Sequence, residues 1–178
     1  SYFQQRGARV ALSDADWNLI ENPPAPPAGA PPAPPAAGLP PPRRDVVVTD
    51  GMPISFGGVE ITPVLIPGHT PGALGFVFRV MDGAQAHTAA LFGGSILLSN
   101  RISDDGLRQY VQSLERFGAV TQRLGVDVEI QNHPLYDGFP QKLERIAARR
   151  GVEPHPCVVG AGAYQRFVTV TSECASAA

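Results

Sequence analysis

The chain has 178 residues, with 14 Lys and Arg against 16 Asp and Glu, so its formal net charge is −2. This near balance argues against nucleic acid or an anionic membrane surface as the main partner. Leu, Ile, Val and Phe make up about a quarter of the residues, above the roughly 20% below which disorder is expected. The length suits one domain, and no apolar run reaches the ~18 residues that a membrane-spanning helix needs.

The hydrophobic pattern alternates between the periods of strands and helices. In chain order it predicts a strand at 9–12, a helix at 14–20 with Ser13 as its N-cap, strands at 45–49, 59–66, 74–81 and 87–92, a helix at 104–120, a strand at 126–130, and helices at 141–150 and 163–174. Strands cluster first, and helices then alternate with one last strand. This order predicts an α+β or layered α/β domain.

Proline is concentrated in one stretch of the chain. Eleven of the 19 prolines lie between Pro23 and Pro42. Proline fixes φ and donates no backbone hydrogen bond, which excludes this stretch from a helix interior or a central strand. We interpret residues 22–44 as an extended Pro/Ala-rich loop inserted in a single domain that spans residues 1–178. A ligand for an SH3-type module is the alternative, but alanine and glycine fill the spaces and no arginine precedes Arg43 in the stretch.

Both cysteines and two of the four histidines lack a recognisable ligand spacing. Cys157 and Cys174 are 17 residues apart, without C-x-x-C spacing. They are either a disulfide formed in an oxidising compartment or two ordinary small buried residues. His87 opens a predicted strand and His155 lies between two prolines. We interpret both histidines as surface or structural residues.

Three candidate site residues each follow a predicted strand. His69 lies in the segment Pro-Gly-His-Thr-Pro-Gly, Ser95 follows two glycines, and His133 lies in Asn-His-Pro. Side chains at the ends of adjacent strands converge on one rim of a sheet, where open sheets place their sites. Glycine and proline around His69 fix its loop, as a metal ligand requires. The pattern therefore predicts that His69, Ser95 and His133 lie close together.

These segments resemble the ligand motifs of the metallo-β-lactamase superfamily. The segment around His69 is similar to the third zinc-ligand motif, and Asn132-His133-Pro134 is similar to the final one. Ser95 falls at the intermediate position, as in the lactamase-like branch in which serine replaces a metal-binding cysteine or aspartate. The similarity extends over nearly the whole chain and implies a four-layer αβ/βα sandwich.

The resemblance also implies a cofactor and residue roles. In the superfamily one or two zinc ions are bound, and a metal-bound hydroxide attacks a carbonyl group. By resemblance, His69 is a ligand of one zinc and His133 of the other. Ser95 is a poor metal ligand, so we expect it to hold a water or a substrate group by a hydrogen bond.

The His-x-His-x-Asp-His motif that supplies most metal ligands in this superfamily is absent from the sequence. The residues after Ser1 resemble the helix that follows this motif in relatives. We therefore expect the C-terminal portion of a member, without its N-terminal βαβ portion. The intact protein is expected to be a zinc-dependent hydrolase of a small-molecule amide, ester or lactam, and the isolated chain is expected to be inactive. The alternative is a non-catalytic module that has lost its metal site and uses its sheet for partner binding.

The missing portion also bears on partners and location. Half of a two-sheet sandwich exposes a broad apolar sheet face, which soluble monomers avoid. We therefore expect this face to pair with the protein's own N-terminal half or with a second copy of the chain. No secretory signal is visible after Ser1, and both a bacterial periplasm and the cytoplasm remain open as locations.

Overall fold

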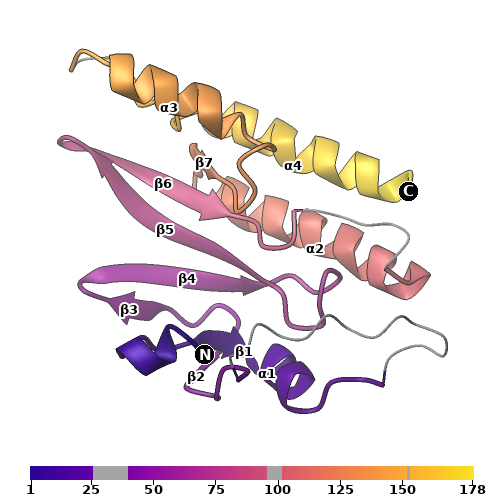
Figure 1. Cartoon of the computed structure of the whole chain (residues 1–178). Helices are drawn as coiled ribbons and strands as arrows, with labels where there is room; N and C mark the ends of the chain where they lie inside the picture. Colours follow the sequence, from indigo (N-terminus) through magenta and orange to yellow (C-terminus); the bar gives the residue numbers. More distant parts are fainter. Residues whose placement is uncertain (26–39, 96–101, 152) are drawn as a thin grey trace.

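The structure is a computed structural model that describes residues 1–25, 40–95, 102–151 and 153–178. Figure 1 shows the arrangement of its helices and strands, which form an α+β fold as predicted. None of the described helices is long and apolar enough to cross a membrane. In chain order the elements are a 3-10 helix Gln4–Arg6, β1 Ala11–Ser13, α1 Asp14–Glu21, β2 Val46–Val48, β3 Ile54–Phe56, β4 Val59–Leu65, β5 Leu74–Asp82, β6 Gln85–Leu91, α2 Asp104–Arg123, β7 Val128–Ile130, α3 Phe139–Ala148 and α4 Ala161–Ser176.

Every strand and helix predicted from the sequence is present, with ends shifted by a few residues. The prediction missed β3, which pairs with β4 in an antiparallel hairpin. The connection is Gly57-Gly58, and both residues have positive φ, 57° and 85°. A Gly-Gly pair between two strand-like segments is a recognised signal of a two-residue hairpin turn, so β3 was predictable from this pair.

The N-terminal part of the chain forms a second, smaller sheet with α1 beside it. β1 pairs in parallel with β2, in a two-stranded sheet. Trp17 of α1 is fully buried, and its indole N–H donates a 2.7 Å hydrogen bond to the carbonyl of Val46. Arg44 forms ion pairs with Asp14 and Glu21 of α1, at 2.6 and 2.8 Å. These ion pairs join the end of the predicted Pro/Ala-rich loop to the helix before it, whereas the centre of the loop, residues 26–39, lies outside the described residues.

The larger sheet places three strand ends at one edge. Its strand order is β3-β4-β5-β6-β7. β5 is antiparallel to both β4 and β6, and β7 is parallel to β6. β4, β6 and β7 therefore run in the same direction. Their C-terminal ends, and the loops that follow them, lie at the same edge of the sheet.

One face of this sheet is covered by α2 and α4, which lie side by side (Figure 1). The helices approach closely at Gly118, where an added methyl group would lie 3.2 Å from Cγ1 of Val168. Between helix and sheet, the ring of Phe92 meets the rings of Tyr110 and Phe117 edge-on, with centroids 5.6 and 5.2 Å apart. Such aromatic pairs add about 0.5–1.5 kcal/mol each beyond their buried area. This core fixes α2 against the strand ends that carry the candidate site.

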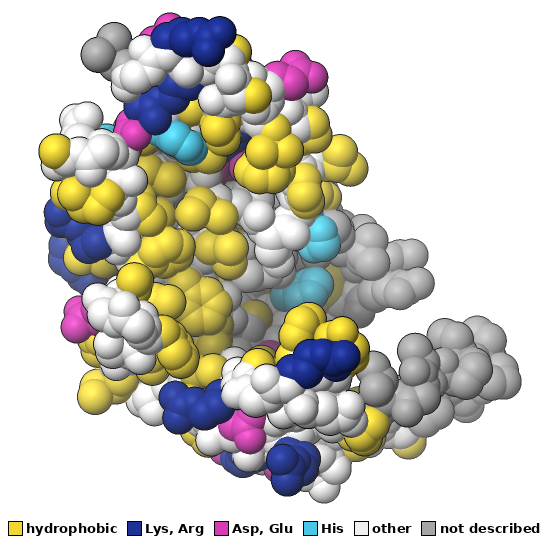
Figure 2. Space-filling view, turned by 60° about the vertical axis from the view of Figure 1, so that its left-hand side comes forward, with side chains coloured by type: hydrophobic (Ala, Val, Ile, Leu, Met, Phe, Trp, Pro, Cys, Tyr) yellow, Lys and Arg dark blue, Asp and Glu magenta, His cyan; other side chains and the backbone are white. Residues whose placement is uncertain are grey.

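The opposite face of the sheet is apolar and partly exposed. The strand register places Ile61, Phe78 and Ala89 as neighbours across β4, β5 and β6 on this face. Figure 2 shows hydrophobic side chains gathered over the hollowed middle of the molecule. We call this surface the open face and define it by the half-buried side chains Ile61, Phe76, Phe78, Val80, Leu91 and Ile130. Its partner stays a prediction.

Candidate active site

Three loops meet where β4, β6 and β7 end, and each carries one predicted site residue. A methyl group built on Gly94 would lie 2.6 Å from Cβ of His69, so His69 packs against the residue before Ser95. The Ser95 hydroxyl donates a 2.8 Å hydrogen bond to Oδ1 of Asn132, the residue before His133. The structure thus brings together the three segments that carry His69, Ser95 and His133.

The loop that carries His69 is held from two sides. On the α1 side, the Asp16 carboxylate accepts hydrogen bonds from the Thr70 hydroxyl and from the Gly72 N–H, both at 2.8 Å. On the α2 side, the Ser113 hydroxyl donates a 2.7 Å hydrogen bond to a carbonyl of the loop. His69 itself is exposed. The loop therefore presents an imidazole from a fixed backbone, which is the arrangement that a binding residue needs.

Gly72→Ala is expected to loosen this attachment and to destabilise the chain. An added methyl group would lie 1.9 Å from Oγ of Ser13 and 2.7 Å from the backbone N of Asp16. Overpacking of this kind costs about 1–3 kcal/mol. Gly162→Ala in α4 is the matched control, because its methyl group would meet only Arg166 Nη1, at 3.6 Å. Urea unfolding of both variants checks the prediction, and an equal stability of the two would contradict it.

Ser95 is nearly buried, at 7% exposure, and the chain before it is tightly placed. A methyl group on Gly93 would lie 2.1 Å from a carbonyl oxygen of β5, and Gly94 has a φ of +79°. Only glycine fits both positions without strain. The Ser95 hydroxyl donates to a protein amide oxygen, and the expected hydrogen bond to water or substrate stays a prediction.

His133 lies in a compact turn after β7 and is half-buried. The N–H of Tyr136 donates to the His133 carbonyl, and the N–H of Phe139 donates to the Pro134 carbonyl, both at 3.0 Å. The Tyr136 ring meets the His133 ring at an angle of 61°, with centroids 6.3 Å apart. The turn and the aromatic contact restrict the orientation of the His133 imidazole.

A buried cluster of charges lies next to this turn. Lys142, the only lysine of the sequence, is 7% exposed. Its Nζ lies 3.0 Å from Oδ2 of Asp137 and 3.9 Å from Oε2 of Glu129. Burial raises the pKa of Glu129, and the charge of Lys142 opposes that rise. Among the described residues, the buried side-chain atoms without a hydrogen-bond partner are Gln131 Oε1, Asp137 Oδ1 and Tyr164 Oη.

The remaining histidines and cysteines have structural surroundings. His87 is nearly buried, and its Nδ1 lies 2.6 Å from Oδ2 of Asp127, which confirms the structural interpretation. Nδ1 of His155 accepts a 3.2 Å hydrogen bond from the N–H of Cys157. Cys157 and Cys174 are both free, so the disulfide interpretation is wrong. Cys174 is exposed, so the alternative interpretation of two buried cysteines is wrong for this residue. Cys157 is half-buried, and burial raises the pKa of its thiol.

Two residues at this edge of the sheet carry side chains of the kind that bind zinc. Zinc takes three or four protein ligands, with imidazole nitrogen among the preferred donors. No group of three or more His, Cys, Asp or Glu side chains in the described ranges is placed to hold a metal ion. His69 and His133 have the right donor chemistry, and the loops that carry them meet at this edge of the sheet. Their imidazoles are compatible with zinc, and a zinc ion held by them would need further donors.

Comparison with solved structures identifies the fold. The chain superposes over 96% of its length on BJP-1, a subclass B3 metallo-β-lactamase of Bradyrhizobium japonicum, with a TM-score of 0.68 and 23% identity. It superposes over 98% of its length on the FEZ-1 metallo-β-lactamase of Legionella gormanii, with a TM-score of 0.68 and 18% identity. The chain has the metallo-β-lactamase fold. No family model matches the chain.

Sequence comparison agrees with this metallo-β-lactamase fold. The chain is 29% identical over 133 residues, 73% of its length, to a hydroxyacylglutathione hydrolase of Pseudomonas entomophila. The resemblance to the metallo-β-lactamase superfamily is thereby confirmed. The chain spans 44% of this relative, 62% of BJP-1 and 65% of FEZ-1.

Three residues that shape this edge of the metallo-β-lactamase fold were not singled out from the sequence. Asp16 lies three residues after the N-cap Ser13, a position that indicates only helix capping, yet its carboxylate binds the His69 loop. Tyr136 follows His133 by three residues, a spacing that a turn brings into contact. One feature of the sequence distinguishes Lys142: it is the only lysine among 14 basic residues.

Proposed function

We propose that this chain is the C-terminal part of a zinc-dependent hydrolase of an amide, ester or lactam, active when joined to an N-terminal half. The observation that carries the proposal is that the loops carrying His69 and His133 meet at one edge of a metallo-β-lactamase fold. The similar proteins are named as hydrolases, of hydroxyacylglutathione in one case and of β-lactams in the others.

In this proposal the chain's own residues hold and orient the reacting groups. His69 and His133 each supply one imidazole to the metal centre, and Asp16 keeps the His69 loop in place through two 2.8 Å hydrogen bonds. Bound zinc would lower the pKa of a water molecule to about 7 and polarise the carbonyl under attack. Ser95, next to both loops, holds a water or a substrate group by a hydrogen bond. The other metal ligands come from the N-terminal half.

The same N-terminal half would cover the open face. Contiguous apolar surface of this kind marks an interaction site in soluble proteins. The chain covers about two thirds of BJP-1, of the Rm3 metallo-β-lactamase and of FEZ-1, which leaves a complementary portion of the fold to pack there. In the absence of that half, a second copy of the chain is the partner that the face would bind.

Metal content and hydrolysis of two proteins test the proposal. The first is the product of the full reading frame that contains this sequence, and the second is the 178-residue chain. The full product is expected to hold about one or two zinc ions per chain and to hydrolyse a β-lactam, an aryl ester or a hydroxyacylglutathione. The 178-residue chain is expected to hold no stoichiometric zinc and to be inactive, because two imidazoles are too few ligands.

Each opposite result has a definite meaning. A full product without zinc and without hydrolysis would overturn the proposal in favour of a non-catalytic module that binds a partner through its sheet. Tight zinc binding by the 178-residue chain would contradict the assignment of ligands to a missing half. His87 or His155 would then be ligands.

A further inference from the structure

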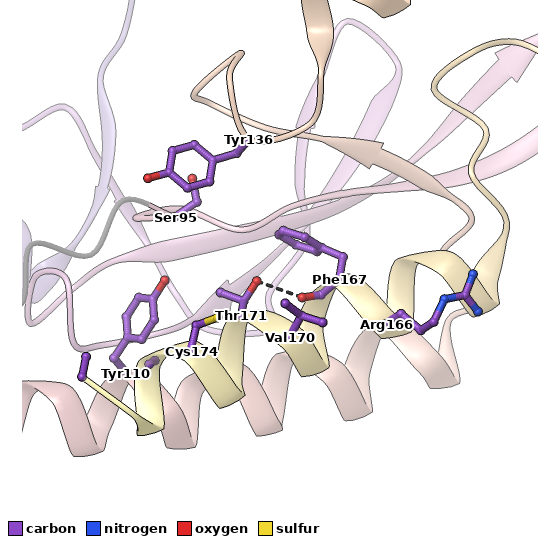
Figure 3. Close-up of a pocket in the computed structure, with 10 residues that line it drawn as sticks. Ser95, Tyr110, Tyr136, Arg166, Phe167, Val170, Thr171 and Cys174 are labelled. Carbon is purple, nitrogen blue, oxygen red and sulfur yellow. Dashed lines mark hydrogen bonds between the residues drawn. The ribbon is translucent and has the colours of Figure 1, made fainter.

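A cavity of about 700 Å³ opens between α4 and the candidate active site. In Figure 3, Ser95 and Tyr136 lie on one side of it, and Phe167, Thr171 and Cys174 of α4 lie on the other. Its volume is within the roughly 300–1,000 Å³ of small-molecule sites. The described residues that line it are Ser95, Tyr110, Tyr136, Arg166, Phe167, Val170, Thr171, Cys174, Ala175 and Ala178.

The cavity is continuous with the candidate active site through two of its lining residues. Ser95 lines the cavity, and its hydroxyl donates to Asn132, next to His133. Tyr136 also lines the cavity, and its ring contacts the ring of His133. A ligand held in the cavity therefore has one end beside the groups that the proposed hydrolase uses.

The lining favours an uncharged group. It combines aromatic and aliphatic surface with a few hydroxyls, and none of its described side chains is a carboxylate. Burial raises the pKa of Tyr110 to about 12, so its hydroxyl stays neutral, and it donates a 3.2 Å hydrogen bond to the Gly94 carbonyl. The Thr171 hydroxyl donates to the Phe167 carbonyl of its own helix. Arg166, the cation of the lining, points away from Ser95 and Tyr136 at the far end (Figure 3).

We propose that this cavity is the specificity pocket of the site and binds an uncharged apolar acyl or aryl group of the substrate. The proposal rests on the proposed hydrolase function and adds the chemical class of the substrate. Burying apolar ligand surface against Tyr136, Phe167 and Val170 stabilises the complex. A charged group would lose its hydration there without gaining a partner near Ser95.

Cys174 provides a direct test, because its free thiol is exposed and lines the cavity. The chain is treated with iodoacetamide in the presence of octanamide, and the alkylation of Cys174 and Cys157 is followed by peptide mass spectrometry. Octanamide at about ten times its Kd should slow the alkylation of Cys174 about tenfold, since only the free form reacts. The rate at Cys157 should not change. Octanedioate is the charged control and should give no protection.

Two variants of α4 distinguish an effect on the cavity from an effect on the helix as a whole. Val170→Asp places a charge in the lining and should abolish the protection, whereas Thr169→Asp, exposed on the same helix but outside the cavity, should leave it intact. Because alkylation requires neither metal nor turnover, protection without hydrolysis by the full product would overturn the proposed function but not the pocket. Equal protection by octanedioate, no protection at Cys174, or equal behaviour of the two variants would overturn the pocket.

Discussion

Replacing Lys142 by methionine should lower the free energy of unfolding by about 3–5 kcal/mol, because it leaves buried carboxylates without their cation. The Asp137 side chain is 3% exposed, and its Oδ2 loses a partner at 3.0 Å. Glu129, whose pKa burial already raises, loses the charge that opposes that rise. Urea unfolding at pH 7 measures the change. Because Asp137 follows His133 by four residues, the loss should also loosen the turn that holds His133.

Two comparisons make the Lys142 prediction specific. Arg108→Met removes a cation paired with Asp105 on α2, but the Arg108 side chain is 67% exposed, so the loss should stay below about 0.5 kcal/mol. The double variant Lys142→Met, Asp137→Leu should recover much of the stability, since replacing both members of a buried pair is often neutral. A Lys142→Met loss no larger than the Arg108→Met loss would show that the buried pair does not stabilise the fold.

The pH dependence of the same variant has a definite sign. A carboxyl group with a raised folded-state pKa favours folding below its unfolded pKa, and this contribution is lost as the pH rises through the folded pKa. Removing Lys142 takes away a positive charge that lowers the pKa of Glu129. The variant should therefore lose more stability, relative to the unchanged chain, near pH 7 than near pH 4, below the raised pKa of Glu129. A loss that is independent of pH would contradict this account of the cluster.

Local sequence pattern predicted most of the fold because the hydrophobic periods of its helices and strands are clear and glycine and proline mark its turns. The helix at 104–120 is α2, and the strands that end before His69, Ser95 and His133 are β4, β6 and β7. The shared direction of these strands then follows from the sheet topology and places the three residues at one edge.

Contacts between distant residues could not be predicted in this way. Asp16 and Thr70 are 54 residues apart, and nothing in either local pattern indicates that they pair. A carboxylate three residues after an N-cap serine is already explained by helix capping. The sequence therefore gives no sign that it also contacts the His69 loop. Lysine is almost never fully buried, so Lys142 on an amphipathic helix is expected in solvent. The cavity likewise depends on how α4 lies beside the Tyr136 turn.

In the full product, His69→Ala should lower both zinc content and turnover by more than ~10–100-fold. That range is the typical cost of losing a residue that only hydrogen-bonds to a metal ligand. The reason is that in the proposed site His69 supplies a ligand directly, from a loop that Asp16 holds in place. His155→Ala is the matched control, because His155 accepts a backbone hydrogen bond from Cys157 and lies in no group of potential ligands among the described residues. Its zinc content should not change.

Ser95→Ala distinguishes a ligand from a hydrogen-bonding residue at the same edge. Its hydroxyl donates to Asn132, and an alkoxide ligand is costly at neutral pH, so zinc content should stay nearly constant while turnover falls. Metal analysis and steady-state kinetics on the same preparations separate the two effects. A parallel loss of zinc in Ser95→Ala and His69→Ala would make Ser95 part of the ligand set. Unchanged zinc in His69→Ala would remove His69 from it, and the convergence of the three loops would then need another explanation.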